Sequence, residues 1–123
     1  MILTFDFSSD TPLYKQLRDQ VVIGIAEGKI APGEKLPTIR ALAEESGINM
    51  MTVSKAYQLL KQEGYILTDR RSGAVVCQPK AEKPFSKDLL ERLRLLISEL
   101  RVAGMTEDEV ADLCRKTYKE GQS

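Results

Sequence analysis

The chain has no histidine and no tryptophan, and only two of its 123 residues are cysteines. Without histidine, it lacks the most common general base and the most common zinc ligand of proteins. Cys77 and Cys114 are too far apart in the sequence to form a metal-binding motif. Gly28-Lys29 lacks the upstream glycine spacing and the following Ser or Thr of a phosphate-binding loop. We therefore predict no catalytic site, no metal site and no cofactor.

Long apolar runs and an excess of either charge are also absent. No run of about 18 apolar residues occurs, and the N-terminus shows no signal peptide, so we expect a cytoplasmic protein. In that compartment both cysteines are expected to be reduced thiols, although a redox role stays open. The 18 basic and 18 acidic residues cancel, which argues against indiscriminate nucleic-acid binding but allows a local basic patch.

Residues 36–63 have the pattern of two short helices joined by a tight turn. Thr38 can cap a first helix that ends at Gly47, and Asn49 can cap a second helix that ends before Gly64. A turn of about three residues between two helices is typical of a helix-turn-helix. In the second helix, the apolar residues recur at helical spacing and are expected to face the core: Val53, Ala56, Tyr57 and Leu60.

The opposite side of this second helix is polar and is left free for solvent or a ligand, with Thr52 and Lys55 near its start. Two β-prone runs follow, residues 65–68 and 74–77, on either side of a turn. Arg70 and Arg71 would lie at the tip of this hairpin, where packing does not explain them. A guanidinium there can pair with a DNA phosphate or enter a minor groove. The pattern therefore predicts a winged helix-turn-helix that binds DNA.

Several structural alternatives apply to the same residues. The two helices could form an ordinary helical hairpin with a solvated polar face. Thr38 could serve only as a cap, and Arg40 and Lys61 only as surface residues. Three tyrosines are expected in the core or at an interface rather than stacked on bases: Tyr14, Tyr57 and Tyr65. The winged helix could also bind a protein, or it could act as the DNA-binding subunit of a larger complex.

The segments on either side of the motif also show clear patterns. Residues 1–7 suggest a short strand or an arm, and a helix with Pro12 in its first turn, capped by Thr11 or Asp10, is expected up to Gly28. Residues 79–84 are polar and bracketed by prolines, which indicates a linker. A helix with an apolar stripe is expected after it, formed by Phe85, Leu89, Leu93, Leu96, Ile97 and Leu100.

A last helix is marked by Thr106 and Glu109, which together form a capping box. The leucine-rich helix before it has more apolar surface than so short a partner can cover. We expect the two-helix tail to pair with a second copy of itself, because two-fold dimers match the half-sites of pseudo-palindromic operators.

Two segments of the chain resemble the GntR superfamily of bacterial winged-helix transcription regulators. One is the run AEGKIAPGEKLPTIRALA at residues 26–43, and the other is TVSKAY at residues 52–57 with EGYI at residues 63–66. The KAY triplet and the short tail resemble the YtrA-like subfamily, whose members carry two helices in place of a large effector domain. The resemblance covers residues 8–78 and implies a dimeric repressor. It leaves open the operator sequence and any small-molecule effector.

Transferred position by position, the resemblance implies three groups of DNA contacts. Thr38 and Arg40 would contact phosphates at the start of the first helix. The N-terminal end of the recognition helix would contribute Asn49, Met50, Met51, Thr52, Ser54 and Lys55. The wing would contribute Arg70, Arg71 and Gly73.

The chain also departs from the family pattern. Many relatives have Asn-Pro-Asn where this chain has Asn49-Met50-Met51, others have arginine at the position of Ser54, and Arg71 replaces the first of two wing glycines. These departures bear on the target sequence, since a methionine can contact a thymine methyl group or simply fill space.

The complete prediction is a mainly α fold with a small β-hairpin wing. Residues 1–78 form the winged helix-turn-helix, residues 79–84 the linker and residues 85–123 a two-helix dimerisation region. The predicted partners are an operator in double-stranded DNA and a second copy of the chain, with no membrane.

Overall fold

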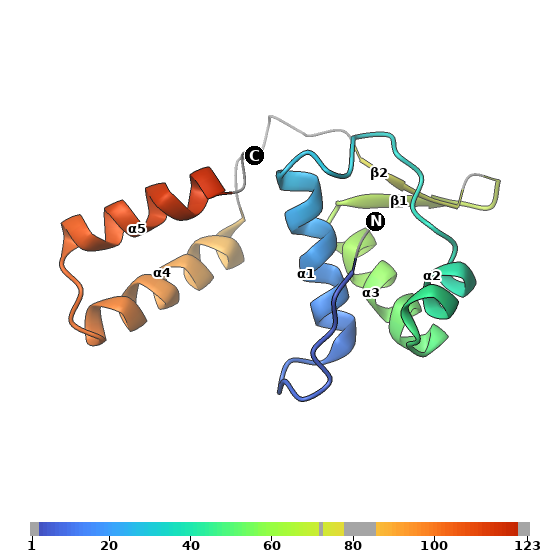
Figure 1. The fold of residues 1–123 in the computed structure, drawn as a ribbon. Helices are drawn as coiled ribbons and strands as arrows, with labels where there is room; N and C mark the ends of the chain where they lie inside the picture. The colour runs from blue at the N-terminus through green and yellow to red at the C-terminus, as the bar shows by residue number, and fades with distance from the viewer. Residues whose placement is uncertain (1–2, 72, 78–85, 121–123) are drawn as a thin grey trace. The chain divides into compact units, whose positions relative to one another are not determined.

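A computed structural model describes residues 3–71, 73–77 and 86–120 (Figure 1). The chain divides into two compact units, Met1–Pro79 and Lys80–Ser123, and each is described by itself. The predicted linker, residues 79–84, lies outside the described residues. Within the described ranges, no helix is long and apolar enough to cross a membrane.

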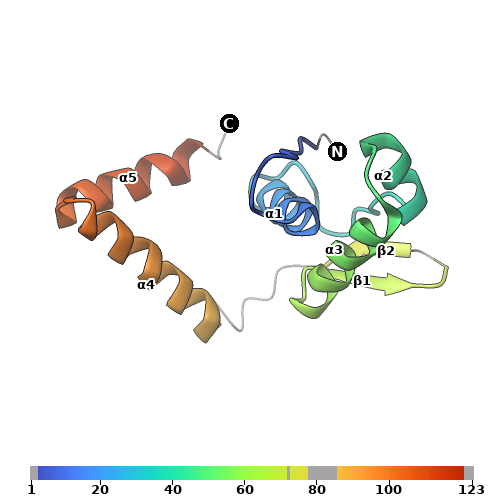
Figure 2. The same cartoon turned by 90° about the horizontal axis from the view of Figure 1, so that it is seen from below.

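The first unit is a winged helix-turn-helix, as the sequence predicted. Its order is α1 (Leu13–Ala26), α2 (Ile39–Ser46), α3 (Met50–Gln62), β1 (Ile66–Asp69) and β2 (Gly73–Val76). Figures 1 and 2 show α1 and α2 beside α3, and α1, α2 and β1 all contact α3. The helix that would read DNA is therefore also the central element of the unit.

The boundaries of α2 and α3 follow from the capping residues that the sequence indicated. The Thr38 hydroxyl accepts a hydrogen bond from the Ala41 amide at 3.1 Å, and Gly47 ends α2 with a φ of 71°. The Asn49 carboxamide oxygen accepts a hydrogen bond from the Met51 amide at 2.6 Å. Each cap satisfies a backbone donor that has no partner within its helix, so the sharp turn between the helices is set locally.

The start of α1 differs from the prediction. Pro12 occupies the N-cap position with extended backbone, and no side chain caps the helix, so the predicted cap at Thr11 or Asp10 is wrong. The reason is that Thr11 lies one residue too far from the first turn, and its carbonyl instead accepts a hydrogen bond from the Gln16 side chain.

Residues 3–6, before α1, form an arm rather than a strand. The side chain of Gln20 pairs with the backbone N–H and C=O of Thr4, and that of Gln16 pairs with those of Asp6 in the same way. Two glutamines one helical turn apart on α1 thus take the place of a neighbouring strand. They hold the arm against the helix, where Leu3 and Phe5 pack at the edge of the core.

The core of this unit is built around α3. Val53, Ala56 and Leu60 have no exposed surface, and Tyr57 is 5% exposed, which confirms the predicted inner face. Leu17 and Val21 of α1 and several other residues complete the cluster, among them Leu42, Ile48 and Ile66. The Tyr57 hydroxyl donates a hydrogen bond to the Pro37 carbonyl at 2.7 Å, so α3 is also fastened to the residue that precedes the cap of α2.

The hairpin is shifted by one residue from the predicted strands. Asp69 and Gly73 form its last pair, because the Asp69 carboxylate accepts a hydrogen bond from the Arg71 amide and Gly73 has a φ of 71°. Both features turn the chain at the tip. The segment before α2 also joins the sheet, since the Leu36 amide donates to the Ala74 carbonyl at 2.8 Å.

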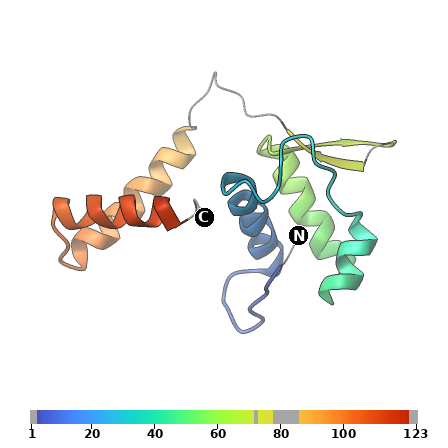
Figure 3. The same ribbon diagram turned by 45° about the horizontal axis from the view of Figure 1, so that its top comes forward.

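The second unit is a helical hairpin of α4 (Lys87–Val102) and α5 (Glu107–Glu120), which fold back on each other (Figure 3). Ser86 caps α4, and the predicted capping box at α5 is confirmed by reciprocal hydrogen bonds between Thr106 and Glu109. The hydrogen bond from the Thr106 backbone lowers the pKa of Glu109. Val110 is buried, whereas no residue of α4 is.

The first prediction concerns the stability of the core at high pH. Burial raises the pKa of Tyr57 from 10.0 to about 12. The unfolded chain therefore releases this proton at lower pH than the folded chain, so folding stability is present below pH 10 and falls as the pH rises towards 12. We expect Tyr57 to account for about 2 kcal/mol of that fall in the free energy of unfolding.

Urea unfolding at several pH values from 7 to 11 measures the first part of this fall, about half of it by pH 11. Tyr57→Phe should be less stable than wild type at pH 7 by about 1 kcal/mol, and the difference should shrink as the pH rises above 10. Tyr118→Phe is the control, because Tyr118 is 73% exposed. A difference between wild type and Tyr57→Phe that stays constant with pH would contradict the assignment.

Candidate nucleic-acid interface

The outer face of α3 is available to a ligand along its N-terminal half. Met51 is 80% exposed and Met50 is 47% exposed, while Lys55 is exposed and Thr52 and Ser54 are half-buried. An exposed methionine is unusual, because its burial in a core or interface is favourable. The predicted contact residues of the recognition helix therefore gather at one end of one helix, on the side opposite the core.

A groove runs beside this end of α3. It is lined by the start of α1 and by the outer side chains of α3, namely Pro12, Leu13, Tyr14, Met51, Thr52, Ser54, Lys55 and Gln58. The groove is mixed in character, with apolar walls and a lysine, a serine, a threonine and a glutamine at its edge. These polar groups can donate hydrogen bonds to phosphate or to base edges.

Lys55 is held over an aromatic ring at the side of this groove. Its ammonium nitrogen lies 4.2 Å from the centre of the Tyr14 ring, which is within the range of a cation–π interaction. Tyr14 was assigned to the core or an interface from the sequence, and the structure places it half-buried beneath Lys55. Tyr14 and Lys55 are 41 positions apart in the sequence, so the spacing of residues along the chain does not predict this contact.

Two of the residues predicted to contact DNA have their side-chain oxygens engaged in helix caps. Thr38 and Asn49 each accept a hydrogen bond from a backbone amide. A threonine hydroxyl retains its one donor and a carboxamide retains the two donors of its NH₂ group, so both side chains can still donate outward. Arg40 is exposed in the first turn of α2, next to Thr38.

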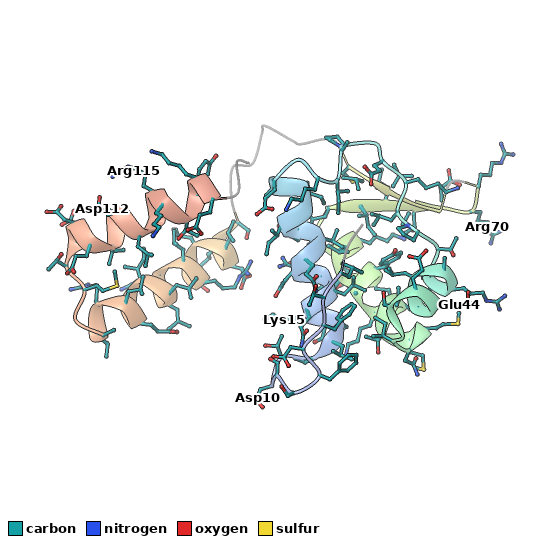
Figure 4. All side chains as sticks on the ribbon, viewed as in Figure 1. Asp10, Lys15, Glu44, Arg70, Asp112 and Arg115 are labelled. Atoms are coloured by element: carbon teal, nitrogen blue, oxygen red, sulfur yellow. The ribbon has the colours of Figure 1, made fainter. Side chains whose placement is uncertain are left out.

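The wing carries its arginines away from the core. Arg70 extends from the tip of the hairpin into solvent, as Figure 4 shows, and Arg71 is exposed as well. Gly73, which also belongs to the predicted set, has a φ of 71° that other residues rarely adopt. Its evident role is to shape the turn that presents the two arginines.

The predicted contact cations are free of ion pairs inside the winged unit. Across residues 3–71 and 73–77, Arg18 and Lys29 pair with carboxylates, whereas Arg40, Lys55, Arg70 and Arg71 have no carboxylate within 4.0 Å. Charges that no carboxylate neutralises remain available to an anionic ligand such as a phosphate backbone.

Arg18 is a positioning residue that sequence reasoning missed. Its guanidinium makes a forked pair with Glu63, the C-cap residue of α3, at 2.8 and 2.9 Å, and it also bonds Asp19. The same group lies 5.5 Å from the centre of the Tyr65 ring. The hydrogen bonds to Glu63 raise the pKa of Arg18, so it stays charged although its side chain is only 11% exposed. Arg18 thus joins α1 to the C-terminal end of α3.

The predicted dimerisation stripe lies along α4, and the structure distinguishes two parts of it. Leu89, Leu93 and Leu96 are 42%, 47% and 58% exposed, whereas Ile97 and Leu100 are half-buried. Phe85 lies outside the described residues. Asp112 and Arg115 pair on the outer face of α5 (Figure 4). The hairpin alone therefore leaves a row of leucines open to solvent.

Known proteins match this chain along its length. Residues 13–76 match the family described as "Bacterial regulatory proteins, gntR family". The chain belongs to the GntR family. Members are DNA-binding transcription regulators and not enzymes, in agreement with the sequence prediction. Among curated relatives, the HTH-type transcriptional repressor YtrA of Bacillus subtilis is 36% identical over 107 residues, which are 85% of this chain and 82% of the relative.

Solved structures extend the comparison to the whole fold of this GntR-family chain. YtrA from Sulfolobus acidocaldarius, a GntR-family transcription factor, is 36% identical and covers 96% of this chain and 97% of its own, with a TM-score of 0.60. A protein described as a transcriptional antiterminator from Listeria monocytogenes is 27% identical, with a TM-score of 0.89 over 100% of this chain and 94% of its own.

A third structure contains DNA. The DNA-binding domain of AraR in complex with the operator ORX1 is 26% identical to this GntR-family chain and has a TM-score of 0.55. The match covers 63% of this chain and 96% of that domain. The YtrA-like resemblance, inferred from the Lys55-Ala56-Tyr57 triplet and the short C-terminal tail, is confirmed by the two YtrA matches.

The second prediction concerns the Arg18 fork. Arg18→Ala should lower the free energy of unfolding by about 2 kcal/mol, because it removes hydrogen bonds between charged groups that are largely shielded from water. Arg92→Ala is the matched control, since Arg92 forms an exposed pair with Asp88 on α4 that contributes less than about 0.5 kcal/mol. Urea unfolding compares the two, and equal losses would show that the fork adds nothing beyond a surface ion pair.

Proposed function

We propose that this GntR-family chain is a dimeric, sequence-specific transcription regulator, a repressor that binds a pseudo-palindromic operator. The observation that carries the proposal is the position of α3, which is buried on one face and carries Met51, Thr52 and Lys55 at the exposed end of the other. A helix of this kind, held by a second helix at a tight turn, fits into the major groove of DNA.

The proposed docking assigns three tasks to three elements. The N-terminal end of α3 enters the major groove with Asn49, Met50, Met51, Thr52, Ser54 and Lys55. Thr38 and Arg40 contact the phosphate backbone and set the register. Arg70 and Arg71 grip the flanking groove or its phosphates, with Gly73 shaping the wing. Phosphate contacts supply much of the affinity, and base contacts supply the selectivity. Loss of a phosphate contact should therefore weaken binding to every duplex, whereas loss of a base contact should weaken binding to the operator.

Two further observations support this arrangement. The contact between Lys55 and Tyr14 restricts the lysine side chain before DNA binds, which reduces the entropy lost on binding. The operator complex of the AraR domain supplies the precedent of a similar fold on DNA.

Self-association would follow from the exposed leucines of α4. Burying one leucine side chain completely contributes about 1.5 to 3 kcal/mol, and Leu89, Leu93 and Leu96 are about half exposed. A second copy presents the same row of leucines, so a two-fold arrangement would bury both rows and bring two recognition helices to two half-sites.

The remaining assignments complete the proposal. Residues 1–78 would be the DNA-binding domain, residues 79–84 the linker and residues 85–123 the dimerisation region, including Phe85, Ile97 and Leu100. A regulator that binds chromosomal DNA would act in the cytoplasm of a bacterium. Within the described ranges, no three Cys, Asp or Glu side chains come together as a metal site.

The third prediction is selective DNA binding that depends on Arg40 and Lys55. We expect the purified protein to bind DNA just upstream of its own gene more tightly than a scrambled duplex, with two protomers per site. Arg40→Ala and Lys55→Ala should each weaken binding about fivefold or more at near-physiological salt. Fluorescence anisotropy across a salt series measures affinity, selectivity and stoichiometry together.

Arg115→Ala serves as the control, because it removes the same charge from the outer face of α5. Unchanged affinity in Arg40→Ala and Lys55→Ala would contradict the docking. If reversing the charge of Arg70 and Arg71 leaves DNA binding unchanged, the polar face and wing serve a protein partner instead. Weak operator binding by the isolated protein would indicate a subunit of a larger complex.

The fourth prediction is that α4 holds the dimer. Replacing Leu93 and Leu96 together by glutamate should halve the mass found by sedimentation, because charges would replace the apolar contact. Leu95→Glu is the control, since Leu95 is 60% exposed but lies outside the predicted stripe. An unchanged mass in the double variant would overturn the proposed interface, whatever its effect on DNA binding.

A further inference from the structure

The connection between α1 and α2 runs beside β2 of the wing and pairs with it through an isolated antiparallel bridge. Three hydrogen bonds join it to β2: Gly33 amide to Val76 carbonyl at 2.9 Å, Val76 amide to Glu34 carbonyl at 2.9 Å, and Leu36 amide to Ala74 carbonyl at 2.8 Å. Lys35 pairs with Val75 in an antiparallel bridge. A segment with the composition of a loop is therefore held in a fixed register against the hairpin.

The register decides which way Lys35 points. Side chains alternate along a strand, and Leu36 faces the core with 3% exposure, so Lys35 lies on the outer surface of the sheet. On β2, Ala74 and Val76 are buried, which leaves Gly73 and Val75 on that same outer surface.

The aliphatic part of the Lys35 side chain packs over Gly73. The Cε atom of Lys35 lies 3.6 Å from the position that a Cβ atom on Gly73 would occupy. The aliphatic part of Lys35 thus runs over the glycine, and its ammonium group lies one bond farther on. Gly73 is the first residue of β2, next to the tip that carries Arg70 and Arg71, so Lys35 adds a third positive charge to that end of the wing.

The charges around this ammonium group favour an external anion. Asp69 lies on the same surface, opposite Gly73, but its carboxylate accepts a hydrogen bond from the Arg71 amide and lies more than 4.0 Å from the lysine nitrogen. Glu34 is the other acid nearby, and its carboxylate accepts a hydrogen bond from the Ala31 amide. Three cations (Lys35, Arg70 and Arg71) and two nearby acids (Asp69 and Glu34) leave a net positive charge at this exposed edge, which suits a chain of phosphates.

We propose that Lys35 is a further DNA-binding residue. It contacts a phosphate of the DNA backbone next to the phosphates that Arg70 and Arg71 bind. This inference rests on the proposed function and adds the connection between α1 and α2 to the DNA interface. Because the lysine binds a phosphate rather than a base edge, it strengthens binding to every duplex and leaves the selectivity unchanged.

The fifth prediction tests this contact with Lys35→Met, which keeps an apolar stem over Gly73 and removes the charge. The probes are a duplex from the DNA upstream of the gene and its scrambled version, each measured by fluorescence anisotropy across a salt series. We expect affinity to fall about fivefold to tenfold for each bound protomer on both duplexes. The slope of log affinity against log salt should decrease by about 0.9 per protomer.

Lys15→Met is the matched control, because Lys15 is exposed on α1 and lies away from the wing (Figure 4). Lys35→Arg should retain the wild-type slope, since it retains the charge. The proposal is overturned if Lys35→Met keeps the wild-type slope, or if Lys15→Met lowers the slope equally.

The proposed function is tested separately, by comparing the binding of the wild-type protein to the two duplexes. If wild type binds the two duplexes equally, the operator assignment at that site fails, while the slope of Lys35→Met still reports the phosphate contact on either duplex. If wild type is selective and Lys35→Met is unaffected, only the Lys35 contact is wrong.

Discussion

The N-terminal unit depends on the burial of one face of α3. Val53, Ala56 and Leu60 lose all contact with water there, and α1, α2 and β1 all pack against this helix. The outer face must meanwhile stay free, as Met51 does with 80% exposure. Rotation of α3 about its axis would expose apolar surface and break the fork between Arg18 and Glu63. The orientation of the outer face is thus a consequence of the core, which is why a small domain can hold a binding surface rigidly.

Much of this unit was predictable because the decisive signals are local. The caps at Thr38 and Asn49 act over two or three residues, so spacing along the chain is enough to find them. The contacts that the sequence did not reveal join distant positions, as with Arg18 and Glu63 or Tyr14 and Lys55. The sequence pattern of a charged residue beside an apolar helical stripe is the same whether its side chain is solvated or forms an ion pair. The cap of α1 was misplaced for a smaller reason, since Pro12 lies outside the helix rather than in its first turn.

The second unit illustrates a different limit of sequence reasoning. Periodicity identified its helices and the capping box at Thr106, but it did not distinguish Ile97 and Leu100, which are half-buried, from Leu93, which is more exposed. An apolar stripe indicates which side of a helix favours burial, but it does not identify the element or the partner that covers that side. Val102, outside the stripe, is 89% exposed, so apolar character alone does not define an interface on this helix.

The pairing of residues 33–36 with β2 also bears on how this chain could vary through evolution. Surface connections ordinarily accept insertions and deletions, because few of their backbone groups have fixed partners. Residues 33–36 are an exception, since their hydrogen bonds to β2 set one register. Adding or removing a single residue within this bonded stretch would turn Leu36 outward and Lys35 into the core. The length of residues 33–36 is therefore constrained, although their composition resembles that of an ordinary loop.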